Sequence, residues 1–410
     1  MTHRLTRLDN GLTIVSLAMP GLETAALSVN ADVGARNESA AENGLAHLYE
    51  HMVFKGTGSR SARAIAEAIE DVGGSLNAWT SRDTTCFHAR VLAGDVPLAL
   101  DLLADLLTDA SFTDADLALE REVVLSEIGE ALETPDDLVF DHLQAIAFPG
   151  QSLGRSILGT GESLAALDAG SLRHWRDTHY RGEGLIVAAA GKVDHDALVE
   201  QAGRLFAHTP AGRPGPIEPA RWSGGTRADA QKNEQLHVAL GFQGFGPEDK
   251  RFDAARLFAM ALGGGMSSRL FQELREERGL AYSVSASHAL HADTGLLSLY
   301  AAARPKDGAQ LLDLARRIAN DTAATLTPAE LNRARAQLKA AILMGLESCS
   351  GQADWLGGSL ITWGRVVPAQ EVIETLNAVS LDEVRAAGAA MLQGPPALAV
   401  VGPKAATLAA

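Results

Sequence analysis

The feature that most constrains the fold of this chain is a repeated order of elements on either side of residue 210. Each half has β-like sequence, then helical sequence, then a β-rich stretch followed by further helices. The register is visible where Phe-Thr-Asp-Ala-Asp-Leu at 112–117 aligns with Leu-Thr-Pro-Ala-Glu-Leu at 326–331. This repeat predicts two related α/β domains.

Hydrophobic periodicity and turn residues predict the elements of each half. Asn10-Gly11 lies between two β-like runs and predicts a hairpin turn. In the first half we expect strands at 24–33 and 184–191, a β-rich stretch at 75–92, and helices at 40–54, 63–72, 96–109 and 113–132. The helix at 40–54 should stop at Gly56. In the second half we expect a strand at 235–243, a helix at 252–262 and a β-rich stretch at 282–302.

Residues 208–225 are rich in proline and glycine and are the best candidate for a linker. The length of 410 residues suggests two or three domains. We therefore predict a first domain at 1–210, a linker at 211–225 and a homologous second domain at 226–410.

Composition excludes several classes of protein. The formal net charge is −16, which argues against a nucleic-acid binder because such proteins need a basic face. Cys86 and Cys349 are too few for a disulfide framework and are expected to be small buried residues. No stretch approaches the ~20 apolar residues of a membrane-spanning helix, and no signal peptide is visible. We expect a cytoplasmic protein, or a periplasmic one if a signal was removed.

The strongest chemical motif is His-Leu-Tyr-Glu-His at 47–51. His47 and His51 are i and i+4, so they project from one face of a helix and can hold one zinc ion. Glu50 lies between them in sequence and can act as a base on a water molecule at the metal, the H-x-x-E-H order. The motif alone could arise by chance, so its context must support it.

A catalytic zinc ion needs a third protein ligand and an open position. Glu120 and Glu127 are i and i+7 on the helix expected at 113–132, so they share one face. One can bind the metal while the other supports the site. In the register of the repeat they align with Ala334 and Ala341, so only the first half carries these acidic residues.

The contexts at 44–57 and 120–127 resemble the pitrilysin/insulinase family of zinc peptidases. They are closest to the branch with the β subunit of mitochondrial processing peptidase and short bacterial relatives. The resemblance implies that Glu127 is the third ligand of one Zn²⁺ per chain and that Glu120 assists. It also implies a zinc metalloendopeptidase in which Glu50 helps zinc-bound water attack peptide bonds of oligopeptides or unfolded segments.

Other stretches extend the resemblance over nearly the whole chain, at 76–82, 153–159 and 263–271. By resemblance, Asn77 and Ala78 lie on a strand that pairs with an extended peptide, and Arg275 and Tyr282 bind the substrate main chain and help to stabilise the oxyanion. The implied fold is α+β, with two homologous domains that each pack a mostly antiparallel sheet against helices and together form one half of a clamshell.

The resemblance also bears on partners. It implies a homodimer, or a heterodimer with a homologous subunit, in which Arg275 and Tyr282 serve the zinc site of the partner chain. Two other functions stay open, a non-catalytic partner subunit and a regulatory module that binds peptides without cleaving them. His288 and His291 lack acidic helix partners and are expected to be structural. The glycine run at 263–265 is not a phosphate loop and should end a helix tightly.

Overall fold

The computed structural model describes residues 2–408 and divides into two compact units. Within the described residues, unit 1 comprises 2–128, 156–218 and 344–367, and unit 2 comprises 129–155, 219–343 and 368–408. This division differs from the continuous one at 1–210 and 226–410, because each unit takes one segment from the other half of the chain. Within residues 2–408, no helix is long and apolar enough to cross a membrane.

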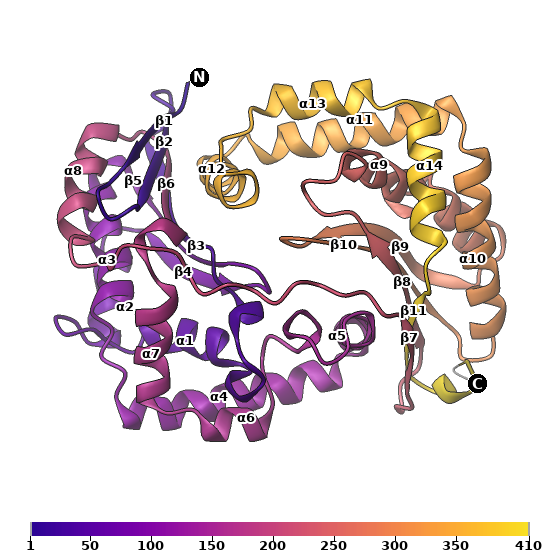
Figure 1. The fold of residues 1–410 in the computed structure, drawn as a ribbon, viewed down its shortest axis with the longest axis horizontal. Helices are drawn as coiled ribbons and strands as arrows, with labels where there is room; N and C mark the ends of the chain where they lie inside the picture. Colours follow the sequence, from indigo (N-terminus) through magenta and orange to yellow (C-terminus); the bar gives the residue numbers. More distant parts are fainter. Residues whose placement is uncertain (1, 409–410) are drawn as a thin grey trace. The chain divides into compact units, whose positions relative to one another are not determined.

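Unit 1 is built on a sheet that, within the described residues, has the strand order β1-β2-β6-β3-β5-β4 (Figure 1). Its strands are β1 (Arg4–Arg7), β2 (Thr13–Ala18), β3 (Thr24–Ala31), β4 (Ser75–Thr80), β5 (Thr85–Leu92) and β6 (Leu185–Gly191). All pairs are antiparallel except β2 with β6. The predicted turn at Asn10-Gly11 joins β1 to β2, with Gly11 at φ 94°. The edge strand β4 pairs with β5.

Unit 2 repeats this plan in the sheet β7-β11-β8-β10-β9. Its strands are β7 (Gly225–Asp229), β8 (Leu236–Gly244), β9 (Ala281–Leu290), β10 (Gly295–Ala303) and β11 (Ala397–Val401). The parallel pair of this sheet is β7 with β11, which corresponds to the parallel pair β2 with β6 in unit 1. The predicted α+β fold with two related, mostly antiparallel sheets is therefore confirmed.

Helices cover one face of each sheet and complete its core. In unit 1, α1 (Leu45–Val53) and α3 (Val96–Thr108) pack on β3, β4 and β5. In unit 2, α9 (Phe252–Gly263) and α10 (Gly308–Thr325) take the corresponding places. The other helices are α2 (Ala62–Glu70), α4 (Asp114–Glu133), α5 (Pro135–Ala147), α6 (Gly161–Ala166), α7 (Ala169–His179), α8 (His195–Leu205), α11 (Pro328–Gly345), α12 (Cys349–Trp363), α13 (Ala369–Ala378) and α14 (Leu381–Leu392).

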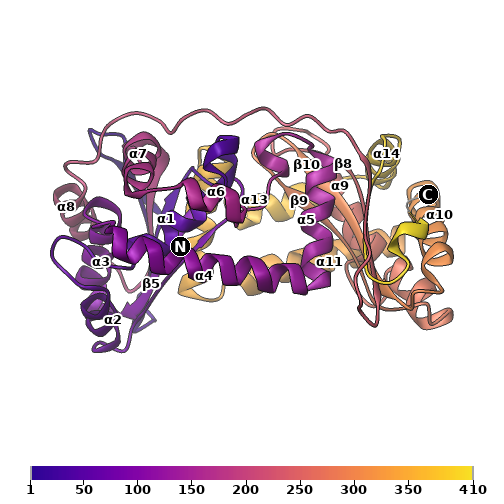
Figure 2. The same cartoon turned by 90° about the horizontal axis from the view of Figure 1, so that it is seen from below.

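The opposite face of each sheet is covered by a helix from the other half of the chain. In unit 1, α12 packs on β2, β3 and β6 (Figure 1). The helix lies so close to the sheet that a Cβ atom on Gly357 would be 2.3 Å from the Asn30 side chain. In unit 2, α5 packs on β7, β8 and β11, and Figure 2 shows α5 beside β8. Cys86 and Cys349 are buried and free, as expected for small core residues.

Helix α1 begins later than the predicted helix at 40–54. Residues 40–42 form a short 3-10 turn, and Gly44 then adopts φ 93°, which interrupts regular helix. The carboxylate of Glu38 accepts hydrogen bonds from the amides of Gly44 at 3.0 Å and Ala46 at 2.8 Å. This buried acid satisfies the free amides at the start of α1 and fixes the helix that carries the histidine motif.

The repeat extends to individual side chains on α4 and α11. Arg121 donates to the carbonyls of Leu164 and Leu167 in unit 1. In unit 2, Arg335 donates to the carbonyls of Leu376 and Val379 in the same way. Both arginines hold the last carbonyls of a short helix, α6 or α13, so they are equivalent structural residues.

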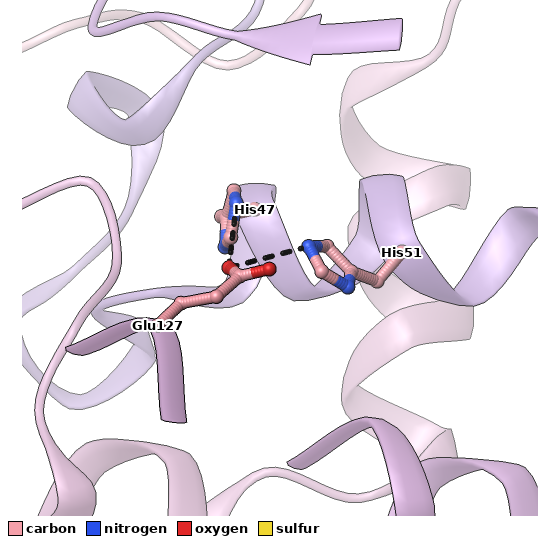
Figure 3. A group of neighbouring side chains, drawn as sticks. All are labelled: His47, His51 and Glu127. Atoms are coloured by element: carbon pink, nitrogen blue, oxygen red, sulfur yellow. Dashed lines mark ion pairs between the residues drawn. The ribbon is translucent and has the colours of Figure 1, made fainter. Parts of the chain in front are cut away.

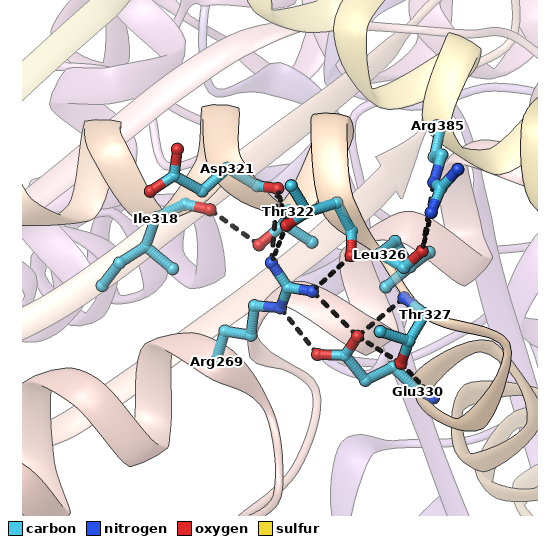
Figure 4. A network of polar contacts seen from close by, with 9 residues as sticks. Arg269, Ile318, Asp321, Thr322, Leu326, Thr327, Glu330 and Arg385 are labelled. Carbon is cyan, nitrogen blue, oxygen red and sulfur yellow. Dashed lines mark hydrogen bonds and ion pairs between the residues drawn. The ribbon is translucent and has the colours of Figure 1, made fainter.

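The α10–α11 junction of unit 2 is held by a network around Arg269 (Figure 4). The Arg269 guanidinium contacts both oxygens of Glu330, at 2.6 and 2.8 Å, and donates to the Thr325 carbonyl at the end of α10. Glu330 also accepts from the amide and hydroxyl of Thr327 at the start of α11. The hydrogen bonds from Arg269 lower the pKa of Glu330, burial raises it, and the hydrogen bonds from Thr327 lower it again. The net result is a pKa of about 2.

Candidate metal centre

Three potential ligands of one metal ion come together in unit 1. His47 and His51 project from one face of α1, and Glu127 reaches toward them from α4 (Figure 3). The nearest carboxylate oxygen, Glu127 Oε2, lies 3.7 Å from His47 Nε2 and 3.6 Å from His51 Nε2. Each residue offers one ligand atom, and the three atoms lie within 4.8 Å of one another.

This geometry fits a tetrahedral zinc ion. Zinc bonds to nitrogen and oxygen of ~2.0–2.1 Å place neighbouring ligand atoms about 3.3 Å apart. The observed separations of 3.7 and 3.6 Å are close to that spacing. Burial, and then the neighbouring His51, lower the pKa of His47 to about 4. His47 is therefore neutral near pH 7, which is the form that binds metal.

Glu120 lies behind the histidine pair and does not face the same space as Glu127. Its side chain is only 7% exposed, and its Oε2 lies 3.1 Å from His51 Nδ1. The other oxygen, Oε1, lies 2.5 Å from the ammonium of Lys55. A carboxylate at Nδ1 fixes the ring orientation of His51 and leaves Nε2 facing Glu127.

Glu50 is half-buried and is held from the edge of the sheet. The hydroxyl of Thr80, the last residue of β4, donates to Glu50 Oε2 at 2.5 Å. Burial raises the pKa of Glu50, while the Thr80 hydrogen bond and His51 act in the opposite direction. A carboxylate with a raised pKa beside two histidines is suited to accept and return a proton.

Asn77 and Ala78 lie on β4, the edge strand of the unit 1 sheet. Among the described residues, β4 pairs with β5 alone, so its other backbone edge has no strand beside it. Exposure alternates along β4, with Asn77 exposed and Ala78 half-buried against the core. A peptide could extend the sheet at this edge.

Arg275 and Tyr282 contact each other in unit 2. The Arg275 guanidinium lies 4.7 Å from the ring centre of Phe271 and 4.9 Å from that of Tyr282. Arg275 belongs to a π-helical turn at Phe271–Glu277, a form frequent at functional sites. The Tyr282 side chain projects from the start of β9 and is 71% exposed. The structure thus brings these two together in unit 2, whereas the histidine cluster lies in unit 1.

Sequence reasoning assigned no role to Lys55 or Thr80. Lys55 follows His51 by four positions, a spacing that places it beside the same helix face. Thr80 gave no signal, because its contact with Glu50 depends on how β4 packs against α1.

His288 is one of the two histidines expected to be structural. Its Nε2 accepts a hydrogen bond from the Phe245 amide at 3.1 Å. Its pKa is lowered to about 4, chiefly by burial.

Comparison with known proteins adds a family. Residues 13–161 match the family model described as insulinase (peptidase family M16), and residues 166–338 match the one described as peptidase M16 inactive domain. A protein of Streptomyces coelicolor named an uncharacterized zinc protease is 39% identical, over 98% of this chain and 90% of its own length. One of Bacillus subtilis with the same description is 34% identical, over 96% of this chain and 97% of its own.

Solved structures agree with this fold. A crystal structure described as a peptidase M16 inactive domain from Pseudomonas fluorescens superposes with a TM-score of 0.91, at 19% identity, covering 98% of both chains. A protease from Helicobacter pylori superposes with a TM-score of 0.88, at 20% identity, covering 98% of this chain and 99% of its own. At these identities the likeness concerns the fold alone.

Proposed function

Because the chain belongs to the insulinase (M16) peptidase family, we propose that it is a zinc endopeptidase acting on oligopeptides or unfolded segments. The observation that carries the proposal is the cluster of His47, His51 and Glu127, whose ligand atoms lie within 4.8 Å of one another. These three residues would hold one zinc ion per chain. Relatives named as zinc proteases support the choice of metal.

In this proposal the chain's own residues divide the work of hydrolysis. When bound, zinc would polarise the scissile carbonyl and lower the pKa of a water molecule. Glu50 would take the proton of the attacking water and pass it to the leaving amine. The Thr80 hydroxyl occupies Glu50 Oε2, so we assign the transferred proton to the other oxygen, Oε1.

The substrate would bind as an extended strand along β4. The main-chain groups around Asn77 and Ala78 would pair with the peptide, which aligns a scissile bond beside Glu50 because Thr80 ends the same strand. Main-chain pairing reads the shape of an extended peptide rather than its side chains. We therefore propose loose sequence specificity.

Arg275 and Tyr282 would contact the substrate main chain and the developing oxyanion. We propose that they act in a homodimer, each pair serving the partner chain. Mixing Glu50→Gln and Tyr282→Phe proteins under conditions of subunit exchange tests this, because one site of a mixed dimer then carries neither lesion. Activity well above the average of the two parents supports the trans arrangement. Activity equal to that average, with exchange demonstrated, contradicts it.

The alternative is a non-catalytic or partner subunit of a heterodimeric peptidase. It differs from the main proposal in one measurable respect, since such a subunit would not hydrolyse peptides alone. The intact set of His47, Glu50, His51 and Glu127 favours the active enzyme.

The decisive experiment is digestion of a peptide mixture, read by mass spectrometry, with and without a chelator. We expect cleavage that the chelator removes and added zinc restores. Glu50→Gln should keep the metal and lose ~10²–10⁴-fold in kcat, because the amide cannot accept the proton. Turnover within about threefold of wild type would remove Glu50 from its role, since losing a general base costs more.

A further inference from the structure

Lys55, Glu120 and His51 form a chain of direct contacts that leads from the protein surface to the metal cluster. Lys55 Nζ lies 2.5 Å from Glu120 Oε1, and Glu120 Oε2 lies 3.1 Å from His51 Nδ1. We propose that Lys55 is a positioning residue of the metal centre, which acts through Glu120 to hold His51 with Nε2 toward Glu127. The inference rests on the proposed zinc site.

The burial of Glu120 explains why it needs a cation. Its side chain is 7% exposed, and an unpaired carboxylate in such a place is costly. An imidazole must be uncharged to bind a metal ion, so a ring that serves as a ligand does not itself bring a positive charge to Glu120. Lys55 supplies a full positive charge from a side chain that is 34% exposed. The ammonium thus fixes the carboxylate that in turn orients the imidazole.

Unit 2 offers an internal comparison for this chain of contacts. The segments His-Leu-Tyr-Glu-His at 47–51 and Arg-Leu-Phe-Ala-Met at 256–260 each precede an arginine, Arg60 or Arg269, by the same number of residues. In this register Lys55 corresponds to Gly264 and His51 to Met260. In the separate alignment of 112–117 with 326–331, Glu120 corresponds to Ala334. All three members are therefore replaced together in unit 2, where no metal cluster occurs in the described residues.

A purely stabilising ion pair is the competing explanation, and zinc affinity separates the two. We would measure zinc dissociation constants by competition with a chromophoric chelator for wild type, Lys55→Met and Lys55→Arg. Lys55→Met should weaken zinc binding ~10–100-fold, the range for partners that orient metal ligands. Lys55→Arg keeps the charge and should recover most of the affinity. Unfolding of the metal-free proteins, followed by circular dichroism, checks that each variant folds.

Lys192→Met is the matched control, because Lys192 pairs with Glu23 at 2.9 Å on the surface of the same unit. It should leave zinc affinity unchanged. If Lys55→Met binds zinc within twofold of wild type, the inference is wrong.

A double-mutant cycle tests whether Lys55 acts through Glu120. Glu120→Gln alone should weaken zinc binding, and adding Lys55→Met to it should cost little more, because the partner is already gone. An equal loss from Lys55→Met in both backgrounds would show that Lys55 acts by another route and would overturn the inference. Failure of the wild-type protein to bind zinc would instead refute the proposed function, so the two failures are distinguishable.

Discussion

Unit 1 and unit 2 share one architecture but differ in the polar residues that architecture carries. At the aligned helices α1 and α9, the buried pair Leu48-Tyr49 corresponds to Leu257-Phe258. The positions of the proposed metal site around this pair differ completely in residue type. His47, Glu50, His51, Glu120 and Glu127 correspond to Arg256, Ala259, Met260, Ala334 and Ala341.

The difference separates what the fold needs from what the chemistry needs. Residues that fill the core or close a helix end are kept in both units, as with Arg121 and Arg335. Packing does not require the acidic and imidazole groups. The same buried position holds Glu120 in unit 1 and Ala334 in unit 2. Burying Glu120 requires Lys55 and His51 around it, which indicates a role other than stability.

The largest expected effect concerns the proposed metal site, which unit 1 has and unit 2 lacks among the described residues. His51→Ala should weaken zinc binding by roughly 10³-fold or more, since one of three ligands is lost, and should abolish peptide hydrolysis. Its counterpart Met260→Ala should lower the unfolding temperature through lost packing and leave zinc binding intact. Metal analysis after reconstitution decides this. Full zinc occupancy in His51→Ala would contradict the ligand assignment.

A smaller effect concerns the two helix starts, where Glu330 and Asp116 are aligned. Glu330→Gln should destabilise unit 2 by about 2 kcal/mol at pH 7, because it breaks the bidentate contact with Arg269. Asp116→Asn should cost less, since the Asp116 carboxylate accepts a hydrogen bond from the Thr113 hydroxyl in its own helical turn and not a bidentate contact from an arginine. Denaturant unfolding of each variant gives these differences.

The Glu330 contribution also has a defined pH dependence. Its pKa is about 2 in the folded protein against an ordinary value of 4.5. A lowered carboxyl pKa stabilises the fold above the unfolded value, and this stability is lost as pH falls from about 4.5 toward 2. The gap between wild type and Glu330→Gln should therefore be constant near neutral pH and shrink in that acidic window. A gap that grows on acidification would contradict the assignment.

The smallest expected effect concerns the helix-end contact that the two units share. Arg121→Ala and Arg335→Ala should each cost about 1 kcal/mol, because each removes hydrogen bonds to two carbonyls at a helix end. Arg333→Ala, on an exposed position of α11, is the control and should change little. Scanning calorimetry compares the three. Losses that differ several-fold between Arg121 and Arg335 would show that the shared contacts do not contribute equally.

Much of the fold could be predicted because its signals are local. The strands at 24–33 and 184–191 and the helix at 113–132 follow from hydrophobic pattern, and their observed limits differ by a few residues. The start of α1 could not be predicted, because it depends on the conformation of Gly44 and on Glu38. The covering roles of α5 and α12 were also hidden, since nothing in an apolar helix face says which sheet it will meet.

The candidate site divides in the same way. The spacing of His47 and His51 on one helix is a local property, so their proximity could be predicted. Glu120 and Glu127 could be placed on one face of α4, but the carboxylate that faces both imidazoles is decided by packing of α4 on α1. The contact of Thr80 with Glu50 arises only through packing, and Lys55, although its spacing from His51 is local, reaches Glu120 only because α4 packs near α1.

The exchange of α5 and α12 affects what a broken chain would do. A cut after Glu218 in the linker would give two fragments, and each would hold a sheet whose covering helix belongs to the other. Apolar side chains of α12, such as Leu356, lie on the unit 1 strands, and those of α5, such as Leu143, lie on the unit 2 strands. Parting the fragments would expose both faces to water, so a nicked molecule should stay together while either fragment made alone should aggregate.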